Sequence, residues 1–308
     1  MGRTVLVAGV SRYLGTRFAR LLSADPSVSR VIGVDVVPPS GEIGSCEFVR
    51  ADIRSPVIAK VIAKAGVDTV VHLGVIATPT GAGGRASMKE INVIGSMQLL
   101  AACQKAASVK RLIVKSTAGV YGASPRDPTS FTEDAAAKVL PRTGWGKDSV
   151  EVEGYVRGFS RRRPDVAVST LRLANVVGPG IRTALTDYLD LPVLPVVLGF
   201  DARLQLLHED DALAALRLAA IGRGVGVVNV AGDGVLLLSQ VAAMAGKPML
   251  AVPGPLTGLA GQLLRRAGLP DFSPEQVRFL SYGRVMDTTR MREVLRFEPA
   301  YSPSLIHI

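Results

Sequence analysis

Short apolar runs alternate with segments of helical periodicity through most of the chain. The apolar runs lie at residues 4–8, 31–35, 46–50, 69–73, 111–115, 167–173 and 227–230, and the helical patterns lie at 15–23, 57–65, 86–107, 147–163 and 212–220. Strands this apolar are typical of parallel sheets that helices cover on both faces. Right-handed crossovers then connect consecutive strands. The order therefore predicts an α/β fold with a doubly wound parallel sheet.

A glycine turn follows the first predicted strand, with the sequence Gly9-Val10-Ser11-Arg12-Tyr13-Leu14-Gly15. Gly9 permits a tight turn, and Gly15 permits close packing of helix against strand. The opening of the helix then offers free backbone N–H groups to a diphosphate. A complete motif would have glycine at position 12, where this chain has Arg12, and we expect its guanidinium to bind the same anion.

Asp35 stands at the end of the second predicted strand, twenty residues after Gly15. A carboxylate there accepts hydrogen bonds from both ribose hydroxyls of an adenosine and repels a 2′-phosphate. Val36, Val37 and Pro38 follow, so the arginine expected for a 2′-phosphate is not next to it. The order of strand, glycine turn, helix, strand and acid predicts a Rossmann domain whose cofactor is NAD rather than NADP.

The pattern changes after Gly178, where prolines and glycines cluster. A helix and a strand return over 212–230, and from residue 239 the chain reads as mostly helical. We therefore predict an NAD-binding Rossmann domain over residues 1–178, to which 203–235 return. Residues 179–202 and 236–308 are predicted to form a smaller, mostly helical substrate-binding subdomain.

The composition narrows the partners and the location. The formal net charge of the 308 residues is +10, and one source is the arginine run 161–163. That run lies where a helix should end, and cations stabilise helix carboxyl ends. The net charge is the only feature that indicates a nucleic-acid-binding protein on this scaffold, so we do not expect nucleic acid as a partner. The start of the chain is not typical of a signal peptide, and no apolar stretch has transmembrane length, so we expect a cytoplasmic protein without a membrane partner.

Cysteine and histidine are too sparse to indicate a disulfide framework or a metal site. Cys46 and Cys103 are far apart in the sequence, and the three histidines show no metal-ligand spacing. We predict two reduced thiols and no bound metal.

Several ordered blocks resemble the NAD-dependent epimerase/dehydratase family of the extended short-chain dehydrogenase/reductases, and the resemblance covers nearly the whole chain. The blocks are Asp52-Ile53, His72-Leu73-Gly74, Asn92-Val93-Ile94-Gly95, Ser116-Thr117-Ala118-Gly119-Val120-Tyr121-Gly122, Leu171-Arg172-Leu173-Ala174-Asn175-Val176-Val177-Gly178-Pro179, His208-Glu209-Asp210-Asp211 and Val228-Asn229-Val230-Ala231-Gly232. Within the family, the chain is most similar to members described as UDP-glucose 4-epimerase-like. The resemblance implies a nucleotide-sugar-like substrate between two subdomains and a homodimer formed through the helices at 86–107 and 147–163.

The resemblance also implies roles for individual residues. Thr117 and Lys147 match catalytic positions, and Asn175 matches a residue that contacts the diphosphate of the substrate. The implied cofactor-binding residues are Gly9, Arg12, Tyr13, Leu14, Gly15, Asp35, Asp52, Ile53, Leu73, Gly74, Asn92 and Lys147.

The tyrosine that serves the family as proton acceptor is missing from its expected position. The family places it four residues before the lysine that matches Lys147, and this chain has Thr143 there. A threonine hydroxyl is a far weaker acid than a phenol, which titrates near pH ~10. Three interpretations follow: the protein binds its ligands without turnover, another group acts as the base (Tyr121, Glu133 or Asp148), or the alignment of 141–147 is shifted.

The sequence predicts an NAD-dependent enzyme of the epimerase/dehydratase type, an isomerase or a lyase that acts on a nucleotide sugar in carbohydrate metabolism. The alternative is a catalytically impaired protein that senses or holds NAD(H) and a ligand without turnover.

Overall fold

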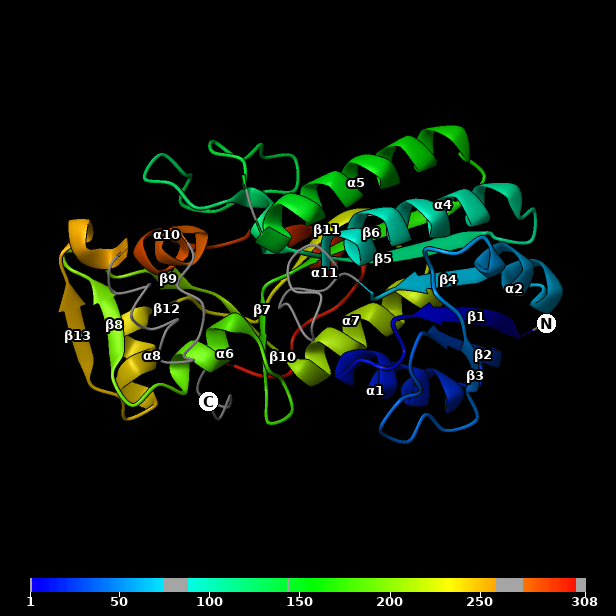
Figure 1. The fold of residues 1–308 in the computed structure, drawn as a ribbon, viewed down its shortest axis with the longest axis horizontal. Helices are drawn as coiled ribbons and strands as arrows, with labels where there is room; N and C mark the ends of the chain where they lie inside the picture. Colours follow the sequence, from blue (N-terminus) through cyan, green and yellow to red (C-terminus); the bar gives the residue numbers. More distant parts are fainter. Residues whose placement is uncertain (1, 75–87, 143, 259–273, 303–308) are drawn as a thin grey trace.

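The central sheet contains seven parallel strands. The computed structural model describes residues 2–74, 88–142, 144–258 and 274–302, and in this part of the chain the strand order is β11-β6-β5-β4-β1-β2-β3 (Figure 1). These strands are β1 (Arg3–Ala8), β2 (Val28–Asp35), β3 (Glu47–Arg50), β4 (Thr69–His72), β5 (Arg111–Thr117), β6 (Ala167–Leu173) and β11 (Gly226–Val230). The order runs outward from β1 in both directions, so the predicted doubly wound sheet is confirmed.

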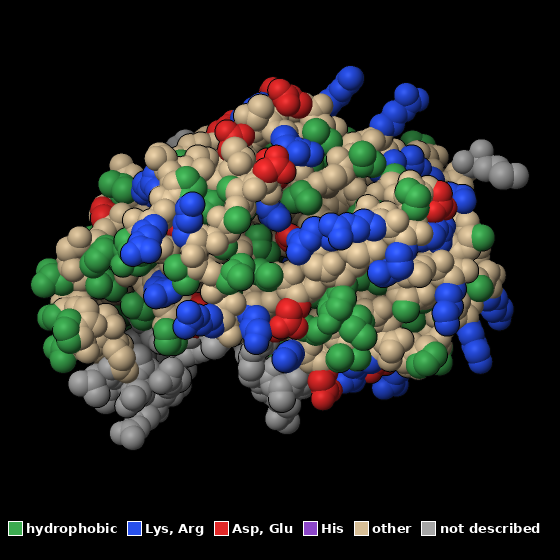
Figure 2. Space-filling model, turned by 90° about the horizontal axis from the view of Figure 1, so that it is seen from above, with side chains coloured by type: hydrophobic (Ala, Val, Ile, Leu, Met, Phe, Trp, Pro, Cys, Tyr) green, Lys and Arg blue, Asp and Glu red, His purple; other side chains and the backbone are tan. Residues whose placement is uncertain are grey.

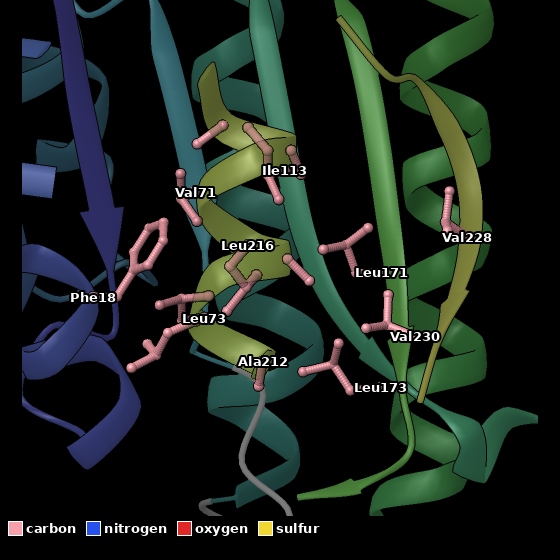
Figure 3. Close-up of a cluster of buried hydrophobic side chains, with 14 of the residues drawn as sticks. Phe18, Val71, Leu73, Ile113, Leu171, Leu173, Ala212, Leu216, Val228 and Val230 are labelled. Atoms are coloured by element: carbon pink, nitrogen blue, oxygen red, sulfur yellow. The ribbon is translucent and has the colours of Figure 1, made fainter. Parts of the chain in front are cut away.

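Helices cover both faces of the sheet and bury two separate cores. One face carries α1 (Tyr13–Ser23) and α7 (Glu209–Ile221), and the other carries α2 (Val57–Ala65), α4 (Ser96–Lys105) and α5 (Gly144–Arg162). Figure 3 shows the first core, where Phe18 of α1 and Leu216 of α7 pack on Val71, Ile113 and Leu171 of the strands. The near-continuous apolar strands are the sequence signature of this two-sided burial.

The helix predicted over 86–107 differs from the structure. The turn Glu90–Gly95 (η1) is a π-helix, α4 follows from Ser96, and the helix ends at Lys105. The Oγ of Ser96 donates back to the carbonyl oxygen of Asn92, and its side chain is buried against His72. Residues 86 and 87 lie outside the described residues. An apolar period close to 3.6 does not distinguish a π turn from an α turn, so the sequence could not predict this change.

A smaller part of the molecule has its own core. It is built on α6 (Ala184–Leu189), β8 (Leu194–Val197), α8 (Leu238–Met244) and α10 (Pro274–Tyr282), which bury Tyr188, Leu194 and Val241 among others. Short strands add to the expected helices. They are β7 (Asn175–Val177), β9 (Arg203–Leu204), β10 (Leu206–His208), β12 (Leu236–Leu237), β13 (Met249–Val252) and β14 (Gly283–Arg284), accompanied by the 3-10 turn η3 (Gly254–Leu256). A second 3-10 turn, η2 (Ala118–Tyr121), follows β5 and packs in the main core.

The short strands pair in three groups, β10 with β7, β9 with both β12 and β14, and β13 with β8. The last described helix, α11 (Thr289–Val294), packs in the core beside β11 through Met291. No helix among the described residues is long and apolar enough to cross a membrane. Figure 2 looks onto the α5 side of the molecule, where Lys and Arg side chains are interspersed with hydrophobic and acidic ones.

Candidate active site

The turn between β1 and α1 is so closely built that two of its positions require glycine. Gly9 has a φ of +88°, and a Cβ there would lie 2.9 Å from the Cα of Gly74, just beyond β4. A Cβ at Gly15 would lie 2.1 Å from the carbonyl oxygen of Gly9. Because both residues are glycines and have no Cβ, α1 can start directly beside the end of β1. The structure thus brings together the predicted cofactor residues Gly9, Gly15 and Gly74, and Leu73 donates its backbone N–H to Ala8.

The first turn of α1 carries backbone donors that have no partner inside the helix. Arg12 is the N-cap and makes no side-chain capping bond, so the N–H groups of Tyr13, Leu14 and Gly15 start the helix without intrahelical acceptors. Helix amino ends bind phosphate oxygens through such groups. Desolvation lowers the pKa of the Arg12 guanidinium, and nearby Asp35 partly opposes this. These residues fit the diphosphate of a dinucleotide.

The side chain of Tyr13 reaches from the glycine turn to α7. Its hydroxyl donates to Oε1 of Glu209 at 2.9 Å, and Arg17 binds both Glu209 and Asp210. A Cβ at Gly180 would lie 2.1 Å from the Tyr13 hydroxyl oxygen. The Tyr13 side chain therefore lies between the glycine turn and the loop that leads to the smaller part of the molecule.

Asp35 ends β2 beside the glycine turn, as the sequence predicts. Its Oδ2 accepts the backbone N–H of Ser11 at 3.1 Å, and its Oδ1 accepts the N–H of Val36 at 2.8 Å. An ionised carboxylate has about four lone-pair sites, so acceptors remain for two ribose hydroxyls. The carboxylate is thus oriented by the same turn that holds Gly9.

The predicted adenine-side pair, Asp52 and Ile53, lies in the loop after β3. Asp52 forms an ion pair with Arg54 at 2.6 Å, and the bonds from Arg54 lower the pKa of the Asp52 carboxyl. Ile53 is buried against η1, where a Cβ at Gly95 would lie 2.8 Å from its Cδ1. The loop is therefore anchored to the helix that carries Asn92.

Asn92 is fully buried and donates from Nδ2 to Oδ2 of Asp148 at 3.0 Å. Asp148 belongs to the first turns of α5, next to Lys147. The Nζ of Lys147 lies 3.9 Å from Oε1 of Glu151, and its side chain is 44% exposed. The Asn92–Asp148 bond thus fixes the start of α5 against η1 and leaves Lys147 at the surface, where a ligand can reach it.

Thr117 ends β5 and is brought to the same region as Lys147. Its Oγ1 accepts the backbone N–H of Gly119 at 3.0 Å and so caps η2. The ring of Trp145 covers Gly119, where a Cβ would lie 2.6 Å from the indole carbons. Because Trp145 lies in the first turn of α5, this contact brings the start of α5, which carries Lys147, next to the end of β5, which carries Thr117. Thr143, at the family's tyrosine position, lies outside the described residues.

The three residues named as replacement bases are held in internal hydrogen bonds. The buried hydroxyl of Tyr121 donates to Oδ1 of Asn229 at 2.7 Å, and desolvation raises the pKa of this phenol. Glu133, also buried, accepts the backbone N–H of Asn229 at 2.8 Å. Asp148 accepts from Asn92. These contacts argue against the interpretation that one of the three replaces the missing tyrosine.

Lys115 is a candidate functional residue that the sequence patterns did not single out. It lies on β5, two residues before Thr117, and is half-buried. Burial first and the nearby Arg12 second lower the pKa of its ammonium to about 8. The available signal was a lysine directly after the three aliphatic residues of this strand.

Asn175, the predicted substrate-binding residue, begins β7 where the chain leaves the central sheet. It pairs with Leu206 of β10 and is half-buried. It therefore lies between the main core and the core of the smaller part, and Gly178 and Gly180 follow it toward that smaller part.

A parallel sheet with a glycine turn at its first strand–helix junction and an acid at the end of its second strand defines a dinucleotide-binding protein of the Rossmann class. Residues 5–229 match the NAD dependent epimerase/dehydratase family. The chain belongs to this family, which confirms the resemblance of the sequence blocks and NAD as the predicted cofactor.

The chain is similar to relatives and to solved structures over nearly its whole length. An uncharacterized protein of Mycobacterium tuberculosis (strain H37Rv) is 49% identical over 97% of this chain and 81% of its own length. UDP-glucose 4-epimerase from Thermotoga maritima, solved with UDP-glucose, is 20% identical with a TM-score of 0.74, over 98% of this chain and 96% of that one. UDP-glucuronic acid 4-epimerase from Bacillus cereus, solved with NAD, is 19% identical with a TM-score of 0.73, over 98% and 95%. At these identities the two solved structures establish the shared fold.

Proposed function

We propose that the protein is an NAD-dependent oxidoreductase of the epimerase/dehydratase type that acts on a nucleotide sugar, with UDP-glucose as the first substrate to test. The observation that carries the proposal is the glycine turn, which is packed against Gly74 and hydrogen-bonded through Ser11 to Asp35. The likeness of the whole fold to epimerases solved with UDP-glucose or with NAD supports the choice of substrate class.

We assign the residues the roles that the glycine turn and the family resemblance imply. NAD, when bound, supplies the acceptor for a hydride from a sugar carbon and the donor for its return. Asp35 accepts the hydroxyls of the adenosine ribose, and the N–H groups of α1 hold the diphosphate. Lys147 binds the nicotinamide ribose and Thr117 the sugar hydroxyl, while Asn175 contacts the diphosphate of the substrate.

A second candidate function is an NAD(H)-binding protein that senses or holds a ligand without turnover. Oxidation of a sugar hydroxyl needs a base that takes its proton as the hydride leaves. Thr143 occupies the tyrosine position, and Tyr121, Glu133 and Asp148 are engaged inside the fold. These observations favour the second candidate over the hypothesis of a replacement base among those three residues.

One set of measurements separates the two candidates. One sample of the purified protein is denatured, and any released dinucleotide is measured by mass spectrometry. A second, native sample is saturated with NAD and incubated with UDP-glucose, UDP-galactose and other nucleotide sugars. Turnover by the wild type supports the oxidoreductase. Binding without turnover supports the second candidate.

The Thr143→Tyr variant tests the missing tyrosine directly. General acid–base groups contribute about 100-fold or more to a rate, so this variant should gain at least about that factor over Thr143→Phe, which lacks the hydroxyl. An empty protein that shows no heat with NAD or NADH would overturn both candidates.

A further inference from the structure

The register of the sheet places Lys115 beside the glycine turn. Ala8 pairs with His72, and His72 pairs with Val114, so these three residues lie level across β1, β4 and β5. The next residue of each segment, Gly9, Leu73 and Lys115, therefore lies one step closer to the carboxyl edge of the sheet. Lys115 thus stands at the level where the turn leaves β1.

The alternation of side chains sets the face that Lys115 occupies. Ile113 packs in the core beneath α1 and α7, together with Leu73, as Figure 3 shows. Val114 packs in the core on the opposite face. Because side chains two residues apart in a strand share a face, Lys115 lies on the α1 and α7 face, the same face as Ile113. Its side chain and the amino end of α1 therefore border the same space.

The groups around Lys115 leave its charge without an opposite partner. Among the described residues no ion pair or hydrogen bond joins the Lys115 ammonium to a carboxylate. On α7, Glu209 binds Tyr13 and Arg17, and Asp211 accepts the backbone N–H groups of Ala300 and Tyr301. These two carboxylates thus have partners other than Lys115, and Oε2 of Glu209 is buried without a hydrogen bond to any described residue.

The charged and titratable groups that interact with Lys115 are cationic or neutral, and the Asp35 carboxylate acts on Arg12. The guanidinium of Arg12, from the glycine turn, disfavours the charged form of Lys115. His72 of β4 is buried, and burial first and Lys115 second lower its pKa to about 4, so it is neutral at ordinary pH. Arg12 and Lys115 are both desolvated cations beside a helix amino end, so they repel each other. An anion bound between them removes this repulsion.

We propose that Lys115 and Arg12 form a cation pair that binds the diphosphate of the dinucleotide from two sides, Arg12 from the glycine turn and Lys115 from the end of β5. This inference rests on the proposed function because it assumes that the glycine turn holds a dinucleotide. In this proposal, the two side-chain charges take the place of the closer backbone contact with the diphosphate that glycine at position 12 would permit.

The test compares three variants with the wild type by titration calorimetry, with NADH and with ADP-ribose as ligands. Lys115→Met removes the charge at similar volume, Lys115→Arg keeps a permanent charge, and Lys60→Met removes an exposed lysine in α2 as a control. A charge-assisted bond to phosphate contributes about 1.5–3 kcal/mol, so Lys115→Met should weaken both ligands at least about tenfold at pH ~7. Lys60→Met should bind like the wild type.

The pH dependence supplies a readout that a purely structural lysine would not give. A free-state pKa of about 8 means that the wild type must take up a proton to bind at higher pH. Its affinity should therefore fall about tenfold from pH ~7 to pH ~9, with proton uptake visible as different heats in two buffers of different ionisation enthalpy. Lys115→Arg should keep its affinity at pH ~9.

Lys115→Met should also melt at a higher temperature than the wild type without ligand, because it removes a desolvated charge.

The outcomes separate this inference from the function on which it rests. If the wild type binds NADH and Lys115→Met binds it equally well with the same pH dependence, the cation pair is wrong and the proposed function stands. If Lys115→Met loses affinity but the wild type shows neither proton uptake nor a fall in affinity at high pH, the diphosphate contact of Lys115 is wrong. If the wild type binds no dinucleotide, the proposed function fails first.

Discussion

Arg172 and Glu153 form a two-pronged ion pair inside the protein, with Nε and Nη2 of the arginine 3.0 and 2.7 Å from the two carboxylate oxygens. The pair joins β6 to α5, and Ser116 of β5 donates to the same carboxylate at 2.6 Å. Both side chains are at most 10% exposed. The pair therefore fixes α5, and with it Lys147, relative to the ends of two strands.

Glu153→Gln should lower the free energy of unfolding by about 3 kcal/mol, because it leaves the Arg172 charge buried without its counter-ion. Urea denaturation of both proteins at neutral pH measures the difference. Glu151→Gln, two residues away and partly exposed, is the matched control and should change stability by less than about 0.5 kcal/mol. Equal effects of the two variants would contradict a structural role for the pair.

Asp35→Asn should weaken NAD binding about tenfold and narrow the preference for NAD over NADP. The amide keeps the size of the side chain and an acceptor for the Ser11 N–H, but it loses the negative charge that repels a 2′-phosphate. Titration with both dinucleotides measures the two affinities. An unchanged ratio, with Glu42→Gln as the exposed control, would show that Asp35 does not face the ribose.

Gly15→Ala should lower dinucleotide affinity by more than about tenfold and destabilise the fold by about 1–3 kcal/mol. The new Cβ would lie 2.1 Å from the carbonyl oxygen of Gly9, so the turn or the start of α1 has to move. Gly254→Ala is the control, since a Cβ there meets nothing within 4 Å. Binding and urea denaturation are measured on both. A fully active Gly15→Ala protein would rule out the close packing described here.

Stability should fall as the pH drops from about 6.5 to about 4 because of His72. Burial lowers the pKa of His72 to about 4, whereas an unfolded histidine titrates near 6.5. Between these values the unfolded chain binds a proton that the folded protein does not, so the buried neutral imidazole costs up to about 3 kcal/mol at the acid end. His72→Gln should flatten this part of the curve of unfolding free energy against pH. Parallel curves for the two proteins would contradict the assignment.

The sequence predicted the features whose causes are local. The glycine turn and Asp35 lie where they were expected because strand, tight turn and helix are each determined by a few neighbouring residues. The ends of most strands and helices fall within a few residues of the predicted ranges for the same reason. Thr117 lies at the end of β5 and Lys147 in the first turn of α5, and both elements were correctly predicted.

The remaining features depend on partners that are distant in the sequence. Tyr121 could be named as a base because nothing near it shows that Asn229, 108 residues later, takes its hydrogen bond. The π turn at η1 lies where Asn92 bonds to Asp148, 56 residues away. Lys115 looked like an ordinary strand residue because the covering of its face of the sheet by α1 and α7 is a tertiary feature. Each of these properties is created by tertiary packing.

The seventh strand of the sheet comes late in the chain and lies at its edge. β11 completes the sheet beside β6, and it carries Asn229, whose side chain and backbone hold Tyr121 and Glu133. A fragment that stops after residue 178 would therefore expose the edge of β6 and deprive the buried Glu133 carboxylate of the backbone N–H of Asn229. The cofactor half of this protein is thus not separable by a single cut, and synthesis has to reach β11 before that half can become stable.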